Sequence, residues 1–204
     1  MAVITISRQF GAGGRTLGKM IADELEYKFL DDVIILEIAK ETKVSTSTVK
    51  SIERIAGGKL SSLFSGLLNR DYMDKIVGTD KGYLDEQGYI KALNKVVIDL
   101  AKQDNIVLMG RGGQYILADF ENAYHFLLVS DMKHRIEFIQ RYYDLDPAKA
   151  EKAVNIGEKK RTTLFKKMHY KDYNSSSHYH LTLNMSMMSL KTAMKTICAM
   201  LESS

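Results

Sequence analysis

The sequence contains one cysteine, one proline and no tryptophan among 204 residues. Cys198 has no second cysteine with which to form an internal disulfide bond, so we expect a protein of a reducing compartment such as the cytoplasm. Its apolar, helix-like surroundings favour a buried thiol over a catalytic one. No apolar run reaches the roughly 18 residues of a membrane helix, and residues 1–7 lack the basic start of a secretory signal.

The composition is otherwise that of a globular protein, with 45% hydrophobic and 26% charged residues. A length of 204 residues indicates one large domain or a core with a small insert. The net charge is +4, and many basic side chains gather late in the chain. This group is either a solvated helix face or an anion-binding segment, and it lacks the interleaved aromatic residues typical of nucleic-acid binding, so we expect no nucleic-acid partner. Its members are Lys159, Lys160, Arg161, Lys166, Lys167 and Lys171.

Short apolar runs alternate with segments of helical periodicity, which predicts an α/β fold with a mostly parallel sheet and helices on both faces. Strands are expected at 3–6, 29–30, 106–109, 124–129 and 179–184. Helices are expected at 17–25, 33–42, 46–56, 90–102, 131–143, 147–170 and 189–201. Residues 57–88 read as an irregular, partly helical and mobile insert, and the Tyr-, Met- and Leu-rich stretch 60–89 is a candidate for a homodimer contact or an acceptor pocket.

A glycine-rich segment, S-R-Q-F-G-A-G-G-R-T, joins the first strand to the first helix at residues 7–16. In the phosphate-binding pattern G-x-x-x-x-G-K-[ST], glycines turn backbone N–H groups toward phosphate, a lysine reaches the terminal phosphates and a hydroxyl binds Mg²⁺. Aligning Gly13 with the second glycine places Arg8 at the first glycine and Gly14 at the lysine. We interpret Arg15 as the first substitute for the missing lysine and Arg8 as the second, because arginine keeps its charge and binds phosphate.

Further charged residues are expected at the same edge of the sheet, since ligands of such sheets bind at the carboxyl ends of the strands. Arg111 follows a buried strand and either points over this edge or lies in a surface turn. Asp31 and Asp32 either hold a hydroxyl, an amine or a metal-bound water, or cap the next helix. The basic group around Arg161 is either a lid that closes over a nucleotide or a solvated face.

The segments I-T-I-S-R-Q-F-G-A-G-G-R-T, F-L-D-D, V-L-M-G-R-G-G and D-Y…H-Y-H-L-T-L-N follow one another in an order that resembles the cytidylate-kinase-like family of P-loop nucleoside monophosphate kinases, over nearly the whole length. The resemblance implies a three-layer P-loop NTPase fold with a five-stranded parallel sheet, a helical lid and a mobile insert. It also implies one kinase-like domain over 1–204, with its core at 1–30, 90–150 and 178–204, an acceptor-side insert at about 31–89 and a lid at about 151–177.

The chemistry that the resemblance implies is transfer of the γ-phosphoryl group of ATP, with Mg²⁺, to a nucleoside monophosphate such as CMP or to a related small acceptor. The residues that match nucleotide-binding positions are Gly11, Ala12, Gly13, Gly14, Arg15 and Thr16, with the Thr16 hydroxyl also on the metal. Arg15, Arg8 and Arg161 match catalytic charges. Acceptor-side positions are Asp31, Asp32, Arg111, Lys160, Lys167 and Asp172.

Three positions depart from the pattern of true cytidylate kinases. Gly14 replaces their lysine, Asp32 stands where they have serine or threonine, and Gly112 stands where they have aspartate. An acidic residue at position 32 repels a monophosphate, so specificity for cytidine does not follow from the resemblance. The alternative function is therefore a nucleotide-binding sensor or regulatory module of the same fold with little or no kinase activity.

Overall fold

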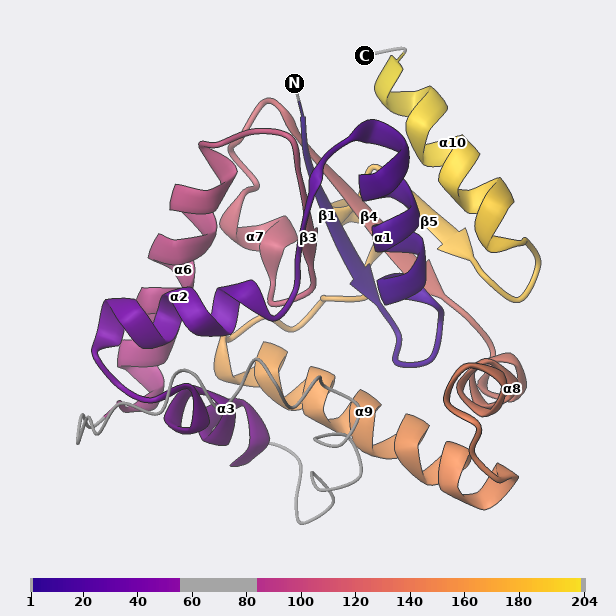
Figure 1. Ribbon diagram of the computed structural model, residues 1–204, viewed down its shortest axis with the longest axis horizontal. Coiled ribbons are helices and arrows are strands. Elements are labelled where there is room, and N and C mark those ends of the chain that lie inside the picture. The colour runs from indigo at the N-terminus through magenta and orange to yellow at the C-terminus, as the bar shows by residue number, and fades with distance from the viewer. Residues whose placement is uncertain (1, 56–83, 203–204) are drawn as a thin grey trace.

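A parallel β-sheet forms the centre of the computed structural model, which describes residues 2–55 and 84–202 (Figure 1). Within these ranges the sheet has five strands in the order β2-β3-β1-β4-β5, and every neighbouring pair is parallel. The strands are β1 (Val3–Arg8), β2 (Lys28–Leu30), β3 (Ile106–Met109), β4 (Ala123–Val129) and β5 (Leu181–Asn184). The predicted five-stranded parallel sheet is thus confirmed.

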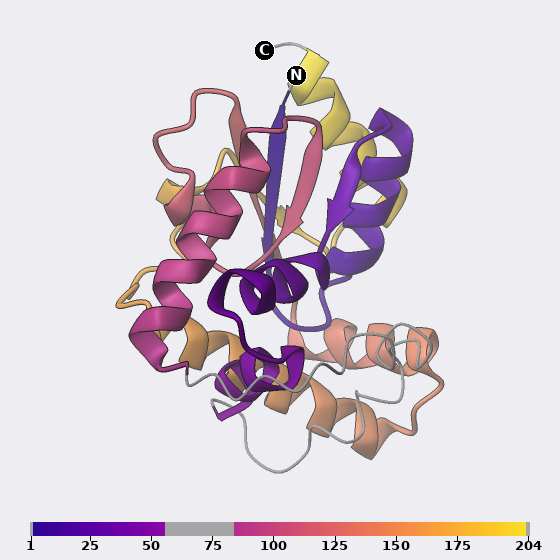
Figure 2. The same ribbon diagram turned by 60° about the vertical axis from the view of Figure 1, so that its left-hand side comes forward.

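Helices cover both faces of this sheet, as Figures 1 and 2 show: α1 and α10 lie on one side, and α6 and α7 lie on the other. The helices on the faces are α1 (Gly14–Leu25), α2 (Val33–Thr42), α6 (Glu86–Ala101), α7 (Gly113–Ile116) and α10 (Leu190–Glu202). Beyond the carboxyl ends of the strands lie α3 (Thr46–Ile55), α8 (Met132–Tyr143) and α9 (Pro147–Lys167). Within the described ranges, no helix is long and apolar enough to cross a bilayer.

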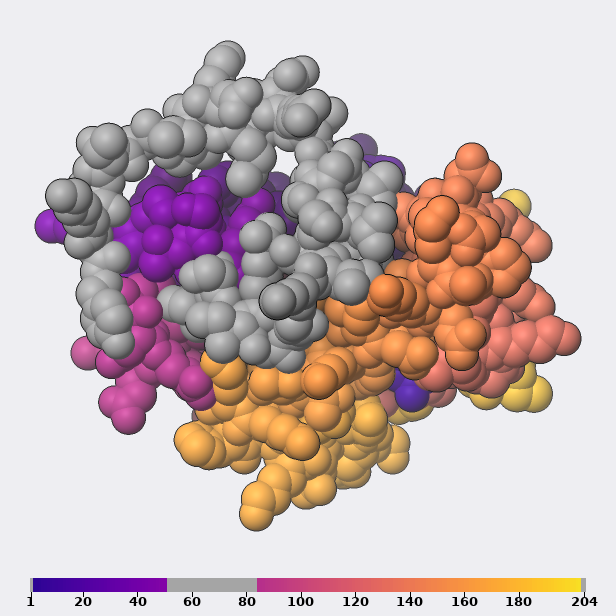
Figure 3. Space-filling model, turned by 90° about the horizontal axis from the view of Figure 1, so that it is seen from below, coloured from indigo at the N-terminus to yellow at the C-terminus, as the bar shows by residue number. Residues whose placement is uncertain are grey.

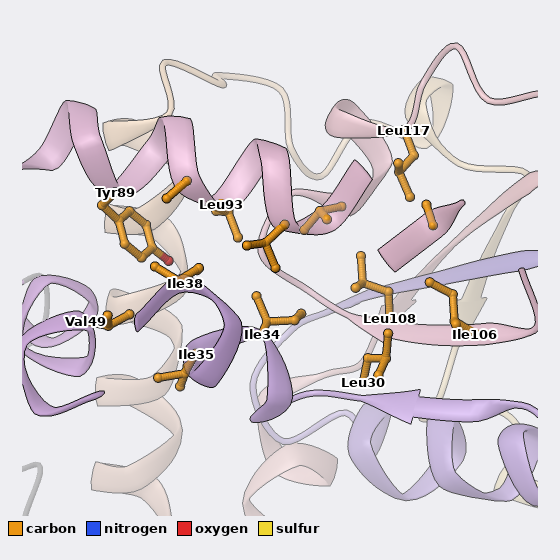
Figure 4. Close-up of a cluster of buried hydrophobic side chains, with 14 of the residues drawn as sticks. Leu30, Ile34, Ile35, Ile38, Val49, Tyr89, Leu93, Ile106, Leu108 and Leu117 are labelled. Carbon is orange, nitrogen blue, oxygen red and sulfur yellow. The ribbon is translucent and has the colours of Figure 1, made fainter. Parts of the chain in front are cut away.

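The two faces are built by alternation along each strand, because successive side chains of a strand point to opposite sides. Ile4 and Ile6 pack with α1 and α10, whereas Val3 packs with α2, α6 and α7. Figure 4 shows the second cluster, in which Leu93 and Tyr89 of α6 lie against the hydrophobic side chains of α2 and of strands β2 and β3. Both faces of the central strands are therefore dry, which explains their continuous apolar sequences.

The ends of several elements differ from the sequence-based prediction. β1 continues two residues further, to Arg8, because its pairing with β4 continues to Arg8 and Leu128. The helix α1 begins at Gly14 instead of residue 17, and α6 begins at Glu86 instead of residue 90, since the Asp85 side chain accepts a hydrogen bond from the Gly88 N–H at 2.7 Å. Because β5 begins at Leu181, the prediction of a strand from residue 179 was two residues too long.

The last part of the predicted basic helix also ends early. α9 stops at Lys167 rather than near residue 170, and His169 takes a left-handed conformation with φ 60°. It begins at Pro147, as predicted, and the Asp146 side chain caps it by accepting a hydrogen bond from the Lys149 N–H. The one-turn helix α7 was not predicted, because four residues carry too little periodicity. Residues 56–83, which hold most of the predicted insert and of the predicted dimer contact, lie outside the described residues.

Candidate functional site

The glycine-rich turn lies at the carboxyl end of β1 and leads directly into α1. Gly11 and Gly13 have φ values of 90° and 80°, a region that other residues rarely enter. Gly13 is the N-cap of α1, so no side chain caps the N–H groups of the first turn of this helix. The Gln9 side chain accepts a hydrogen bond from the Ser130 N–H at 2.8 Å and ties the turn to the end of β4. Uncapped N–H groups at a helix start attract an anion.

Two arginines meet at Asp31, which follows β2 and is 13% exposed. The Arg15 Nε atom lies 3.5 Å from one carboxylate oxygen of Asp31, and Arg111 Nη1 lies 3.4 Å from the other. Arg111 also donates to the Asp31 carbonyl oxygen at 2.7 Å, and Arg15 Nη2 lies 3.3 Å from Asp32. Asp32 occupies the N-cap position of α2, as one interpretation predicted, but its side chain makes no capping hydrogen bond there, and the two carboxylates lie against arginines instead.

Arg8 lies within the electrostatic reach of the same group. Its side chain is half-buried, and burial is the largest cause that lowers its pKa. The charge of Asp31 opposes this shift, while the nearby charges of Arg111, Arg161 and Arg15 lower the pKa further. The guanidinium group stays protonated even so, because its ordinary pKa is far above neutrality. The guanidinium groups of Arg15, Arg111 and Arg161, from α1, the loop after β3 and α9, therefore lie within electrostatic reach of Arg8 at the end of β1.

Arg161 reaches this site from α9. Its Nη1 donates to Glu158 at 2.8 Å, and its Nη2 donates to the Asn174 side chain at 2.6 Å. The guanidinium also lies over the rings of Phe165 and Tyr173, at 5.3 and 5.0 Å from the ring centroids. Only 11% of the Arg161 side chain is exposed, so these contacts hold it in one position.

Glu158 joins α9 to the glycine-rich turn, and the sequence analysis missed this role. Its carboxylate accepts a hydrogen bond from the Phe10 N–H at 2.8 Å and lies 3.5 Å from Arg135 Nη1. The Phe10 ring packs directly on Gly157 of the same helix. The spacing of three residues between Glu158 and Arg161 was a usable signal for their ion pair, but the contact with Phe10 spans 148 positions and has no local signature.

A second polar network lies behind the turn. Gln114 of α7 donates to the Tyr179 hydroxyl at 2.9 Å, and that hydroxyl donates to the Tyr173 carbonyl at 2.6 Å. Burial raises the pKa of Tyr179, while a hydrogen bond with Ser7 and the charge of Arg161 act in the opposite direction. The network links β1 and α7 to the loop that carries Asn174, so it helps to place the partner of Arg161.

The remaining predicted site residues lie at varying distances from this centre. Thr16 is half-buried in the first turn of α1, and Lys160 is half-buried on α9 beside Arg161. Lys167 reaches another element, where its Nζ lies 3.0 Å from Glu86 of α6. Asp172 is exposed, and among the described residues no hydrogen bond or ion pair joins its carboxylate to the arginines.

Comparison with known proteins agrees with this arrangement of strand, turn and helix. The model of the cytidylate kinase-like family matches residues 3–187. The chain belongs to the cytidylate kinase-like family. Its predicted membership, drawn from the motifs around the turn and the loop after β3, is thereby confirmed. A separate comparison with curated proteins found no match.

Solved structures share the fold of this cytidylate kinase-like chain at low sequence identity. An uncharacterized protein from Eubacterium ventriosum has a TM-score of 0.64 at 14% identity, with 100% of both chains covered. A shikimate kinase from Bacteroides thetaiotaomicron has a TM-score of 0.53 at 13% identity, with 98% of each chain covered. A gluconokinase from Sinorhizobium meliloti has a TM-score of 0.52 at 12% identity, covering 99% of this chain and 92% of that one. The three-layer P-loop kinase fold is therefore shown.

Proposed function

We propose that this chain catalyses ATP-dependent phosphoryl transfer to a small acceptor, with a nucleoside monophosphate such as CMP as the first acceptor class. The observation that carries the proposal is the convergence of Arg8, Arg15, Arg111 and Arg161 beside the glycine-rich turn. Phosphoryl transfer is catalysed mainly by positioning and by stabilising negative charge, so a cluster of fixed guanidinium groups is the appropriate equipment. Membership of the cytidylate kinase-like family supports the same reaction class.

Each residue type has a role that follows from its chemistry. The amides from Gly11 to Thr16, together with the guanidinium of either Arg15 or Arg8, bind the phosphate oxygens of the nucleotide; this set includes Ala12, Gly13 and Gly14. Arg161 and Lys160 approach from α9, which lies beyond the carboxyl ends of the strands (Figure 1) and forms part of the surface on that side of the molecule (Figure 3). A helix in this place can exclude water from a bound nucleotide. In this proposal Lys167, the last residue of α9, and Asp172, in the loop that follows, act on the acceptor side.

The residues at the turn fit an ion that prefers oxygen ligands and retains several waters, as Mg²⁺ does. The half-buried hydroxyl of Thr16 supplies one oxygen at the start of α1. Within residues 2–55 and 84–202, no group of three or more His, Cys, Asp or Glu side chains could hold a metal ion, so Thr16 would share the ion with phosphate oxygens of the nucleotide and with water. When bound, Mg²⁺ supplies neutralisation of the charge on the phosphate oxygens.

The acceptor side is less positive than the number of arginines suggests. Asp31 counters Arg111 and Arg15, and Asp32 adds a second carboxylate beside Arg15. These carboxylates weaken the attraction for a monophosphate and offer hydrogen-bond acceptors to a hydroxyl group. A small hydroxylated acceptor is therefore the second class to test, beside CMP and the other nucleoside monophosphates.

The proposal also includes the cellular location and the oligomeric state. Cys198 is a free, buried thiol, which supports a cytoplasmic location. A homodimer through residues 60–89 remains part of the hypothesis, and sedimentation at several protein concentrations tests it.

A nucleotide-binding sensor is the second candidate function. Gly14 stands at the position of the catalytic lysine, and two of the four arginines are already paired on the acceptor side. Such a site binds a nucleotide without having to transfer its phosphoryl group. Both candidate functions require nucleotide binding, and only the kinase transfers the phosphoryl group to an acceptor.

Calorimetry with Mg-ATP and Mg-GTP, followed by a coupled ADP-release assay, separates the candidates. The acceptor panel contains CMP, the other nucleoside monophosphates and small hydroxylated acids. Acceptor-stimulated release of ADP supports the kinase, and binding without such stimulation supports the sensor. If neither nucleotide binds at millimolar concentration, both candidates fail.

A further inference from the structure

The family pattern requires a cation at the start of α1, and this chain has Gly14 there. The structure shows which side chain fills the resulting space. A Cβ atom added to Gly14 would lie 2.8 Å from Cγ of Arg8 and 3.2 Å from its Cβ and Cδ. Real atoms do not approach so closely, so any side chain at position 14 would have to displace Arg8. The stem of Arg8 thus runs over the place from which a lysine side chain would start.

A second glycine accommodates the other end of the same side chain. Gly110 directly follows β3, and its N–H donates to the Ile6 carbonyl at 2.9 Å. A Cβ atom at Gly110 would collide with Nη1 of Arg8, and the φ of 66° independently disfavours other residues. Arg8 therefore lies in a groove made by two glycines, one on α1 and one after β3, and its guanidinium is directed to the carboxyl edge of the sheet.

The pairing of the four guanidinium groups distinguishes Arg8 from the others. Arg15 pairs with Asp31 and Asp32, and Arg161 pairs with Glu158. Arg111 pairs with Asp31. In the described part of the chain, by contrast, no hydrogen bond or ion pair reaches the guanidinium of Arg8. Because no carboxylate among these residues lies at ion-pair distance from it, this guanidinium has its hydrogen-bond donors available for an anionic ligand.

The position of Arg15 argues against it as the substitute for the lysine. Its side chain is 43% exposed and extends toward Asp31 and Asp32, on the acceptor side of the turn. To reach a phosphate in the turn, Arg15 would have to leave both carboxylates. The order of preference drawn from the sequence, Arg15 before Arg8, therefore reverses when the contacts are considered.

We infer that Arg8, at the end of β1, is the side chain that binds the terminal phosphates of the nucleotide in place of the P-loop lysine, and that Gly14 and Gly110 are small because Arg8 occupies their space. This inference rests on the proposed binding of a nucleoside triphosphate and adds the residue that holds it. In the family pattern the positive charge comes from a lysine at the start of the helix, whereas here it comes from Arg8 at the end of the preceding strand.

The test exchanges the two positions and reads binding as well as activity. We would measure calorimetric binding of inorganic tripolyphosphate without metal, and of Mg-ATP, for the native chain, Arg8→Gln, Arg8→Gly and Arg8→Gly/Gly14→Lys. Arg8→Gln retains most of the stem that packs on Gly14, so its fold should persist. Arg141→Gln, an exposed residue of α8, removes the same charge elsewhere and is the matched control. Thermal unfolding of every variant checks the fold.

The expected result is a loss of about 30-fold in affinity for both ligands in Arg8→Gln, as for a hydrogen-bonded charge, and less than two-fold in Arg141→Gln. The exchange variant should recover most of the affinity that Arg8→Gly loses. Native affinity in a folded Arg8→Gln overturns the inference while leaving the proposed function intact. An exchange variant no better than Arg8→Gly overturns the exchange of positions. Absence of binding by the native chain overturns the proposed function and this inference together.

Discussion

His125 of β4 should make the stability of this protein fall steeply in mild acid. The side chain is 6% exposed, and Thr5 Oγ1 lies 2.7 Å from its Nδ1. Burial, followed by the charge of His180, lowers the pKa of His125 from 6.5 to about 4, and a hydrogen bond to the Leu117 carbonyl opposes the shift only in part. The Leu117 carbonyl accepts a hydrogen bond from the other ring nitrogen, which therefore carries the proton, so Nδ1 of the neutral ring accepts a hydrogen bond from the Thr5 hydroxyl.

The sign and size of the effect follow from proton linkage. Between pH 6.5 and about 4, His125 is protonated in the unfolded chain but not in the folded one. The unfolded state therefore binds more protons, and the free energy of unfolding decreases as the pH falls through this window. A shift of about 2.5 pKa units corresponds to about 3 kcal/mol, which is fully present above pH 6.5 and lost near pH 4.

Urea unfolding at intervals between pH 3.5 and 7.5 measures this loss. The variant His125→Gln cannot take up the proton, so the stability difference between the native chain and the variant should shrink by about 3 kcal/mol across the window. His169→Asn, at an exposed position, is the control and should follow the native curve. A constant difference between native chain and His125→Gln, or an NMR titration of His125 with a midpoint near 6.5, refutes the reasoning.

Three further outcomes are expected. Glu158→Gln leaves Arg135 and Arg161 without their carboxylate and should lower the free energy of unfolding by about 1–3 kcal/mol in urea, whereas an equal loss in Glu151→Gln, an exposed position of α9, would contradict the specific role. Gly157→Ala should destabilise although alanine favours a helix by about 1 kcal/mol, because its Cβ collides with Phe10. Thermal unfolding should show that Phe10→Ala relieves this clash, and additive losses would argue against the contact. Asp31→Asn removes negative charge from the phosphate site and should tighten tripolyphosphate binding about five-fold by calorimetry, with unchanged affinity counting against the shared field.

The central sheet could be predicted from the sequence because its strands are buried on both faces. Runs such as I-V-L-M at 106–109 are apolar throughout and end at glycine, so length and punctuation identify them without any tertiary information. The turn after β1 could also be predicted, because its glycines lie close together in the sequence. Strands and turns of this kind can be recognised because the residues that define them are consecutive in the sequence.

The pairing within the site could not be predicted in the same way. Arg111 and Asp31 are 80 positions apart, and their contact depends on β2 and β3 lying side by side. The sequence showed that both residues follow strands, and it left open whether they face a ligand or each other. The sequence named Arg8 only as the second candidate for the missing lysine for a related reason, because the inferred preference for Arg8 depends on the space beside Gly14 and Gly110, from two different elements. The absence of a side chain at a glycine indicates a function only when the residues packed against that glycine are known.

The pairing pattern also decides how mutations of the arginines should be interpreted. Arg15, Arg111 and Arg161 each hold a carboxylate from another segment or from the same helix, so replacing any of them removes charge and a structural contact together. A loss of activity in those variants mixes weaker binding with a displaced loop or helix. Arg8 has no such pair among the described residues, so neutralising it changes the field at the turn with the least change in architecture. Among the four, Arg8 is consequently the position at which a change in affinity reports most directly on phosphate binding.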